Sequence, residues 1–207
     1  MSRTPLMEAF RLAFRVGVLF SVGILCSMVL NPLQIQHRVT TLSMFTWWVA
    51  PCCGAAAVFI GLVYPCVDDC VGHGDSAILT DWTSVMRCLV VFLGINQASV
   101  SIPYSDDQHL ALSLAAMSLG MWFLFDRTAY GFGLGISVAA LATFVAQIFV
   151  FSDFYTYTHP DFLFVRSWLP AIFFCGGVTF GHLGRKLADV SSLCAVPELY
   201  NIALGRS

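Results

Sequence analysis

Long apolar stretches alternate with short polar ones along the whole chain. Six such stretches are found, at 12–33, 44–64, 83–102, 109–125, 131–151 and 162–183. A helix needs about 20 apolar residues to cross a hydrocarbon layer of roughly 30 Å. The pattern therefore predicts an all-α membrane protein with six transmembrane helices. The connecting segments are short, so we expect a single domain over residues 1–207.

The basic residues are distributed unevenly between the two sides of this arrangement. With six spans, eight of the ten Lys and Arg residues lie on the side that holds both termini, and two lie on the other. The eight are Arg3, Arg11, Arg15, Arg87, Arg127, Arg185, Lys186 and Arg206, and the two are Arg38 and Arg166. Because cytosolic loops carry an excess of Lys and Arg, we expect both termini in the cytosol.

Composition supports a membrane protein and excludes several other classes. The chain is 58% hydrophobic and 11% charged, whereas soluble domains carry about 25% charged residues. A net charge of −2 argues against a nucleic-acid partner. Most of the eight cysteines lie in apolar segments, where a thiol acts as a small hydrophobe. Cys66 and Cys70 lack a second Cys/His pair nearby, so no metal site is expected.

Glycines recur at helical spacing in the last two apolar stretches. Gly131 and Gly135 are four residues apart, as are Gly177 and Gly181, and Gly184 continues the second row. Small residues at this spacing allow helices to approach closely in lipid. The rows predict either packing within the bundle or a docking face for another membrane protein, and the two are compatible.

A few polar side chains fall at membrane depth. Asn96, Gln97 and Gln147 lie within predicted spans, and His109 lies at the end of one. A polar group buried in hydrocarbon needs a hydrogen-bond partner, because an unsatisfied one costs roughly several kcal/mol. An apolar ligand with one or two hydroxyls could supply that partner, and so could hydrogen bonds between helices.

Two oppositely charged residues lie at similar depth near the cytosolic boundary. Arg87 is near the start of the third predicted span and Asp126 is at the end of the fourth. They could form an intramolecular ion pair. Alternatively, Asp126 could be an exposed hydrogen-bonding group for a partner protein.

No catalytic motif is present, so we expect no enzymatic activity. The sequence lacks a Gly-x-Ser-x-Gly elbow, a His-Glu-x-x-His motif and paired intramembrane aspartates. A small transporter or an intramembrane enzyme for a lipid-like substrate is the alternative class. Most ionisable groups lie at the edges of the spans, which disfavours a water-accessible transport path.

Several sequence strings carry a specific resemblance. They are LQIQ at 33–36, WWVAPCCG at 47–54, GLVYPC at 61–66, SVMRC at 84–88, GIN at 94–96, FDR at 125–127, GFGLG at 131–135, PDFL at 160–163 and VRSWLP at 165–170. In these strings the chain resembles the Insig (insulin-induced gene) family of endoplasmic-reticulum membrane proteins. The likeness extends over residues 16–188.

The resemblance implies a multi-pass protein of the endoplasmic reticulum that acts in sterol feedback. Members of the family bind oxysterols such as 25-hydroxycholesterol and then hold Scap, with its cargo SREBP, in that membrane. They also bind HMG-CoA reductase when sterols are abundant and connect it to membrane-bound ubiquitin ligases. A rigid apolar sterol suits a groove between helices lined by aromatic and small residues.

Four positions inherit an expected role from the family. Phe92 matches a sterol-contacting phenylalanine in the third span, and Trp122 matches a tryptophan late in the fourth. His109 replaces a glutamine near the sterol, and its imidazole can also hydrogen-bond a hydroxyl. Asp126 matches an aspartate that the family requires for holding Scap and the reductase.

The chain also departs from the family pattern. Phe123 replaces a second tryptophan, and the basic loop after the second span is replaced by an acidic one without lysine. Lys186 is the only lysine of the chain. We therefore expect ubiquitin-driven turnover through that loop to be absent.

Overall fold

The fold is entirely helical in the part of the chain that the structure describes. The computed structural model describes residues 5–36, 46–71, 81–101, 107–151 and 169–193. The helices are α1 (Pro5–Gln36), α2 (Thr46–Val71), α3 (Trp82–Ser101), α4 (Asp107–Phe125), α5 (Ala129–Phe151) and α6 (Leu169–Leu193). Each helix overlaps one of the six predicted spans. The prediction of an all-α fold is confirmed.

Three helices extend further than the apolar pattern predicted. α1 begins at Pro5, ahead of the predicted start at residue 12. α2 continues through Pro65 to Val71, into the segment expected to be a loop. α6 continues to Leu193, past the end of the last predicted span at residue 183. Hydropathy marks where the apolar layer ends, whereas backbone hydrogen bonds can continue beyond it into water. The extension of α6 also packs, since Leu187 is only 3% exposed.

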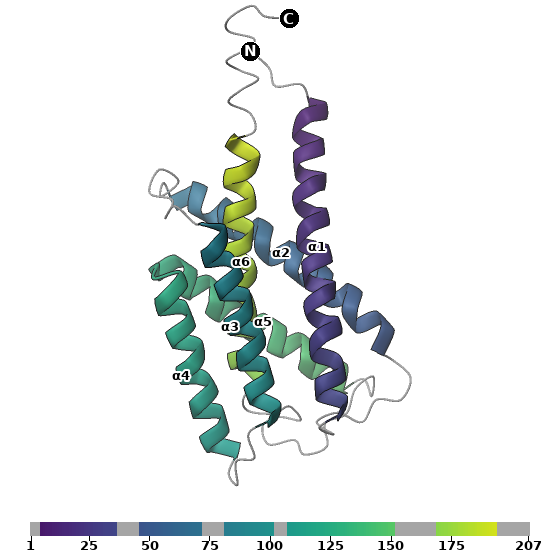
Figure 1. Cartoon of the computed structure of the whole chain (residues 1–207), viewed down its shortest axis with the longest axis vertical. Helices are drawn as coiled ribbons and strands as arrows, with labels where there is room; N and C mark the ends of the chain where they lie inside the picture. The colour runs from purple at the N-terminus through teal and green to yellow at the C-terminus, as the bar shows by residue number, and fades with distance from the viewer. Residues whose placement is uncertain (1–4, 37–45, 72–80, 102–106, 152–168, 194–207) are drawn as a thin grey trace, which may run out of the picture.

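The central element of the bundle is α6. It packs against each of the other five helices, with its largest contacts on α5 and α2. α1 packs mainly on α2, while α3 and α4 contact each other and α6. In Figure 1, α2 and α5 cross the bundle obliquely, and the start of α1 lies at the same end as the close of α6. No sequence pattern had indicated which helix is central.

Glycines make the closest helix contacts. A β-carbon on Gly177 of α6 would lie 3.5 Å from the Cα of Gly135 of α5. On α6, Gly181 packs against the ring of Tyr64, and Gly184 packs against the backbone of Gly61. The predicted glycine rows therefore serve packing within the bundle, and this alternative is confirmed for Gly135, Gly177, Gly181 and Gly184.

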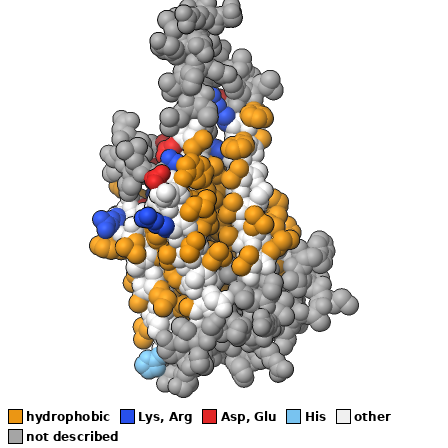
Figure 2. Space-filling model, viewed as in Figure 1, with side chains coloured by type: hydrophobic (Ala, Val, Ile, Leu, Met, Phe, Trp, Pro, Cys, Tyr) orange, Lys and Arg blue, Asp and Glu red, His pale blue; other side chains and the backbone are white. Residues whose placement is uncertain are grey.

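The outer surface of the bundle is strongly apolar. Large hydrophobic side chains are exposed on most helices, with Phe10 at 73%, Leu112 at 67% and Phe144 at 60%. Figure 2 shows hydrophobic side chains over much of the described face, with the charged ones gathered toward one part of it. Three described segments, over Glu8–Val29, Val49–Cys70 and Ala129–Ile148, are long and apolar enough to cross a membrane. The molecule is a membrane protein whose outer face suits lipid.

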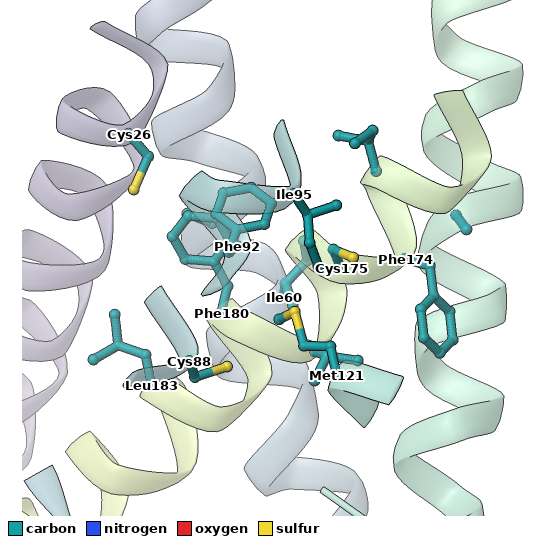
Figure 3. Packing of buried hydrophobic residues seen from close by; sticks show 14 of the residues in the cluster. Cys26, Ile60, Cys88, Phe92, Ile95, Met121, Phe174, Cys175, Phe180 and Leu183 are labelled. Carbon is teal, nitrogen blue, oxygen red and sulfur yellow. The ribbon is translucent and has the colours of Figure 1, made fainter. Parts of the chain in front are cut away.

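The buried interior is built around α6. Phe92 of α3 and Phe180 of α6 pack edge to face, with ring centroids 6.2 Å apart (Figure 3). Cys175 of α6 is fully buried, and its Sγ lies 3.2 Å from the Oγ of Ser118 on α4. The seven cysteines in the described ranges are free thiols. Side chains of α3 and α4 thus help to hold α6 at the centre.

Candidate functional site

The α4–α5 corner, residues 126–131, holds the most unusual polar arrangement in the described structure. Asp126 is only 1% exposed, and its Oδ1 accepts a hydrogen bond from Thr128 Oγ1 at 2.7 Å. Thr128 also caps α5, because its Oγ1 accepts the backbone N–H of Gly131 at 3.0 Å. Arg127 has a left-handed backbone with φ of 54°, which turns the chain between the two helices. The short turn therefore folds over the carboxylate of Asp126.

The partner of Asp126 is Arg185 of α6. Arg185 Nη1 lies 2.7 Å from Asp126 Oδ1. The same guanidinium binds Asp68 of α2 through two atoms, with Nε 2.5 Å from Oδ2 and Nη2 3.0 Å from Oδ1. Its Cζ also lies 5.0 Å from the centroid of the Tyr64 ring. One cation thus joins α2, α6 and the α4–α5 corner.

The electrostatics of Arg185 favour its charged form. Burial alone would lower the pKa of the guanidinium, but the hydrogen bond to Asp68 and the charge of Asp126 outweigh it, so the pKa is raised. Arg185 is 16% exposed and Asp68 is 24% exposed. Charged pairs this far from water interact more strongly than pairs on an open surface.

Two expectations about Asp126 are corrected by this geometry. Its ion pair is with Arg185, whereas Arg87 is exposed on α3. The carboxylate is enclosed, so it is not the exposed group that the sequence reading offered as the alternative. Hydropathy places Asp126 at the edge of a span, which does not indicate whether its side chain is buried. It is buried because α6, which carries Arg185, lies at the centre of the bundle.

Sequence reasoning also missed Arg185 and Asp68. Both residues lie beyond the ends of predicted spans, Asp68 after residue 64 and Arg185 after residue 183, so the apolar pattern gave no sign that they are paired. The signal that could have found them was their shared side of the membrane. Asp68, Asp126 and Arg185 all map to the predicted cytosolic boundary, where charges of opposite sign can meet.

Three residues expected to contact a sterol lie in different surroundings. Phe92 is buried at 6% between α3 and α6. Trp122 is half-buried near the end of α4, with its ring 4.8 Å from that of Phe132 and its Nε1–H donated to Thr128 O at 3.1 Å. His109 is exposed in the first turns of α4.

The spacing along α4 separates His109 from Trp122. Thirteen residues at 1.5 Å each place them roughly 20 Å apart along the axis, and at 100° per residue roughly 140° apart around it. The structure does not bring these two side chains together. Phe92 contacts α6 directly through Phe180. Trp122 packs on Phe132 of α5, which in turn meets Phe174 of α6 edge to face at 5.7 Å. Their roles toward a sterol stay predictions.

The buried amide of Asn96 has its partner within its own helix. Its Nδ2 donates to Phe92 O at 2.8 Å, and its backbone oxygen accepts Ser99 Oγ at 2.7 Å. Neither predicted alternative, a ligand hydroxyl or a bond between helices, is needed for this donor. Across the described segments, no group of three or more His, Cys, Asp or Glu is placed to hold a metal ion.

The sequence profile of the insulin-induced protein family (INSIG) matches residues 14–188 of this chain. This chain belongs to the Insig family. The insulin-induced gene 1 protein of Homo sapiens is 51% identical over 186 residues, covering 86% of this chain and 67% of that protein. The insulin-induced gene 2 protein of Gallus gallus is 50% identical over 189 residues, covering 87% and 84%.

A solved structure shares the fold. The mycobacterial Insig homologue MvINS from Mycobacterium vanbaalenii superposes with a TM-score of 0.71 and 16% identity, covering 83% of this chain and 92% of that one. At this identity the likeness concerns the fold alone. The Insig family consists of regulatory adaptors rather than enzymes, and this Insig protein therefore has a regulatory role in the sterol pathway.

Proposed function

We propose that this Insig protein is an oxysterol-binding retention adaptor of the endoplasmic-reticulum membrane. It holds the Scap–SREBP complex when sterols are abundant and promotes degradation of HMG-CoA reductase through membrane-bound ubiquitin ligases. The observation that carries the proposal is the 51% identity with the human insulin-induced gene 1 protein over 86% of the chain. An adaptor acts by binding one state of its partner more tightly, which shifts the population of that partner.

The proposed topology has six spans with both termini in the cytosol. The N-terminal end of α1 and the C-terminal end of α6 lie at the same end of the bundle, which supports this topology (Figure 1). The uneven distribution of basic residues supports it as well. Labelling of single engineered cysteines with a membrane-impermeant maleimide tests the proposal. Labelling of both termini only from the lumenal side would contradict it.

The proposed sterol site involves Phe92, Trp122 and His109. Phe92 supplies an aromatic ring against α6, Trp122 supplies one against α5, and His109 supplies a polar group at the other end of α4. Phe92→Ala and Trp122→Ala are expected to weaken saturable binding of radiolabelled 25-hydroxycholesterol. Phe123→Ala is a matched control, because Phe123 is 57% exposed and points away from the bundle.

The control for folding uses another core residue of similar burial. Leu110 is also 6% exposed, so Leu110→Ala removes comparable apolar packing on α4. If Leu110→Ala weakens sterol binding as much as Phe92→Ala does, the effect reflects lost packing. Unchanged binding in both Phe92→Ala and Trp122→Ala would refute the proposed site.

Partner capture is proposed to require Asp126. Co-purification of Scap from membranes containing 25-hydroxycholesterol is expected to fail for Asp126→Ala. Asp69→Ala is the matched control, because it also removes a carboxylate, and Asp69 is exposed near the C-terminal end of α2, next to Asp68. Normal capture by Asp126→Ala would refute the assignment of Asp126.

A further inference from the structure

The carboxylate of Asp126 is closed off by the protein itself. Its Oδ1 is occupied by Arg185 and Thr128. Its Oδ2 is buried without a hydrogen-bond partner in the described structure. That oxygen lies against the backbone of Gly131, in the space that a β-carbon on Gly131 would occupy. The contact suits glycine, whose exposed Cα–H groups can approach an oxygen closely.

Tyr64 fastens the same corner from the other side. Its ring is fully buried under the guanidinium of Arg185, and its hydroxyl donates to the backbone oxygen of Gly131 at 3.2 Å. α2 therefore holds the start of α5 directly through Tyr64 and holds Asp126 indirectly through Asp68 and Arg185. The position of residues 126–131 depends on contacts from two helices that are distant in sequence.

An enclosed carboxylate is poorly placed to bind a partner protein directly. A partner's donor would have to displace Arg185 or Thr128 from Oδ1, or open the contact with Gly131 at Oδ2. Either route leaves a buried charge without compensation during exchange. The side chains that the turn presents outward are others, since Arg127, Ala129 and Tyr130 are exposed.

We infer that Arg185 and Gly131 are positioning residues that hold Asp126 inside the α4–α5 corner, and that Asp126 sets the shape this corner presents to a partner without touching it. The inference rests on the proposed function where partner capture is concerned. Its structural half, the fixing of residues 126–131 by a buried carboxylate, is independent of any partner. The two halves are therefore tested separately.

Glycine variants give the sharpest comparison. Gly131→Ala adds one methyl group where Asp126 Oδ2 lies, so the carboxylate must leave its site. Gly133→Ala adds the same methyl group two residues later, where nothing lies within 4 Å. Both changes have the same effect on intrinsic helix propensity. Any difference between them reports on the contacts of Gly131 with Asp126 and with Thr128, which itself binds Asp126.

The first experiment measures amide hydrogen exchange of the full-length protein in nanodiscs, without a partner. Gly131→Ala, Arg185→Met and Asp126→Ala are expected to exchange about tenfold faster or more over residues 126–131, as the loss of a hydrogen bond to a charged group implies. Gly133→Ala and Lys186→Met are expected to exchange as the native chain does. Exchange in the buried stretch where α1 packs on α2 is expected to be unchanged in all five variants. Unchanged exchange of the corner in Arg185→Met, or uniformly faster exchange throughout the bundle, would overturn the inference.

The second experiment measures capture of Scap by the same variants. Gly131→Ala and Arg185→Met are expected to lose capture as Asp126→Ala does, while Gly133→Ala retains it. Arg185→Lys keeps a cation between the two carboxylates and is expected to restore part of the capture lost in Arg185→Met. Normal capture by Gly131→Ala together with fast exchange of its corner would overturn the link between corner shape and partner binding. If the native chain captures no Scap, the proposed function fails, and the exchange data alone decide the inference.

Discussion

The contact between Gly184 of α6 and Gly61 of α2 predicts a large effect of a single methyl group. A β-carbon on Gly184 would lie 2.5 Å from the Cα of Gly61 and 2.6 Å from its carbonyl carbon. Nonbonded carbons prefer a separation of about 3.5–4.0 Å. Because the obstacle is backbone rather than a flexible side chain, Gly184→Ala can be accommodated only if α2 and α6 move apart by roughly 1 Å at this crossing.

The cost of that movement follows from what the crossing holds together. A gap of about 0.5–1 Å removes a quarter to a half of the dispersion energy of each affected contact. Overpacked sites in folded proteins lose about 1–3 kcal/mol, and backbone obstruction belongs at the upper end of that range. The same movement stretches the ion pair between Asp68 of α2 and Arg185 of α6. We expect Gly184→Ala to lower the free energy of unfolding by about 3 kcal/mol or more.

The assay is reversible unfolding in mixed micelles, with detergent as denaturant and helical circular dichroism as the signal. Gly94→Ala is the control, because Gly94 lies in the middle of α3 with nothing within 4 Å of an added β-carbon. Alanine has the higher helix propensity, so this variant should be unchanged or more stable by up to about 1 kcal/mol. A native midpoint for Gly184→Ala, or an equal loss in Gly94→Ala, would show that the contact between Gly184 and Gly61 does not limit the approach of α2 and α6.

Three smaller changes test other contacts by the same unfolding assay. Tyr64→Phe removes the buried hydrogen bond to Gly131 and should cost about 1 kcal/mol; no loss would mean that this bond is unimportant. Ser118→Ala removes the hydrogen bond from Ser118 Oγ to the backbone oxygen of Ala171, at 3.1 Å, and should lower the free energy of unfolding by about 0.6 kcal/mol. A loss several times larger would contradict the modest value expected for one hydrogen bond between helices. Arg127→Gly relieves a left-handed backbone with φ of 54° and should be neutral or stabilising by up to about 1 kcal/mol; strong destabilisation would contradict that view.

The apolar pattern was sufficient to locate every helix but not to say where each one ends. A helix that crosses a membrane needs a run of apolar residues, and each of the six predicted runs overlaps one helix of the described residues. Beyond the apolar runs, the length of α2 and α6 depends on packing. Leu183 and Leu187, which are 2% and 3% exposed, hold the extension of α6 in place. That packing involves distant segments, so the local sequence does not reveal it.

Glycine spacing predicted close helix contacts, but not their partners. Four-residue spacing identifies a flat helix face, and the structure confirms that such faces pack. Only the arrangement of α6 between α2 and α5 determines that Gly177 meets Gly135 while Gly184 meets Gly61. A periodicity describes one helix and carries no information about its neighbour.

The candidate site was located in part. Asp126 was singled out from the family resemblance, and the structure places it at a junction of four helices. Its partner Arg185 is 59 positions later in the chain, and the second carboxylate, Asp68, is 117 positions from Arg185. Pairs so distant in sequence become neighbours only once α6 is known to be central. For the same reason, the burial of Asp126 could not be inferred from its place at the end of an apolar stretch.

The most direct test of the account is co-purification of Scap with the native chain from membranes, with and without added 25-hydroxycholesterol. We expect capture that depends on the sterol, because the adaptor and the sterol together favour one state of the partner. Absence of capture in both conditions would contradict it, and so would equal capture in both.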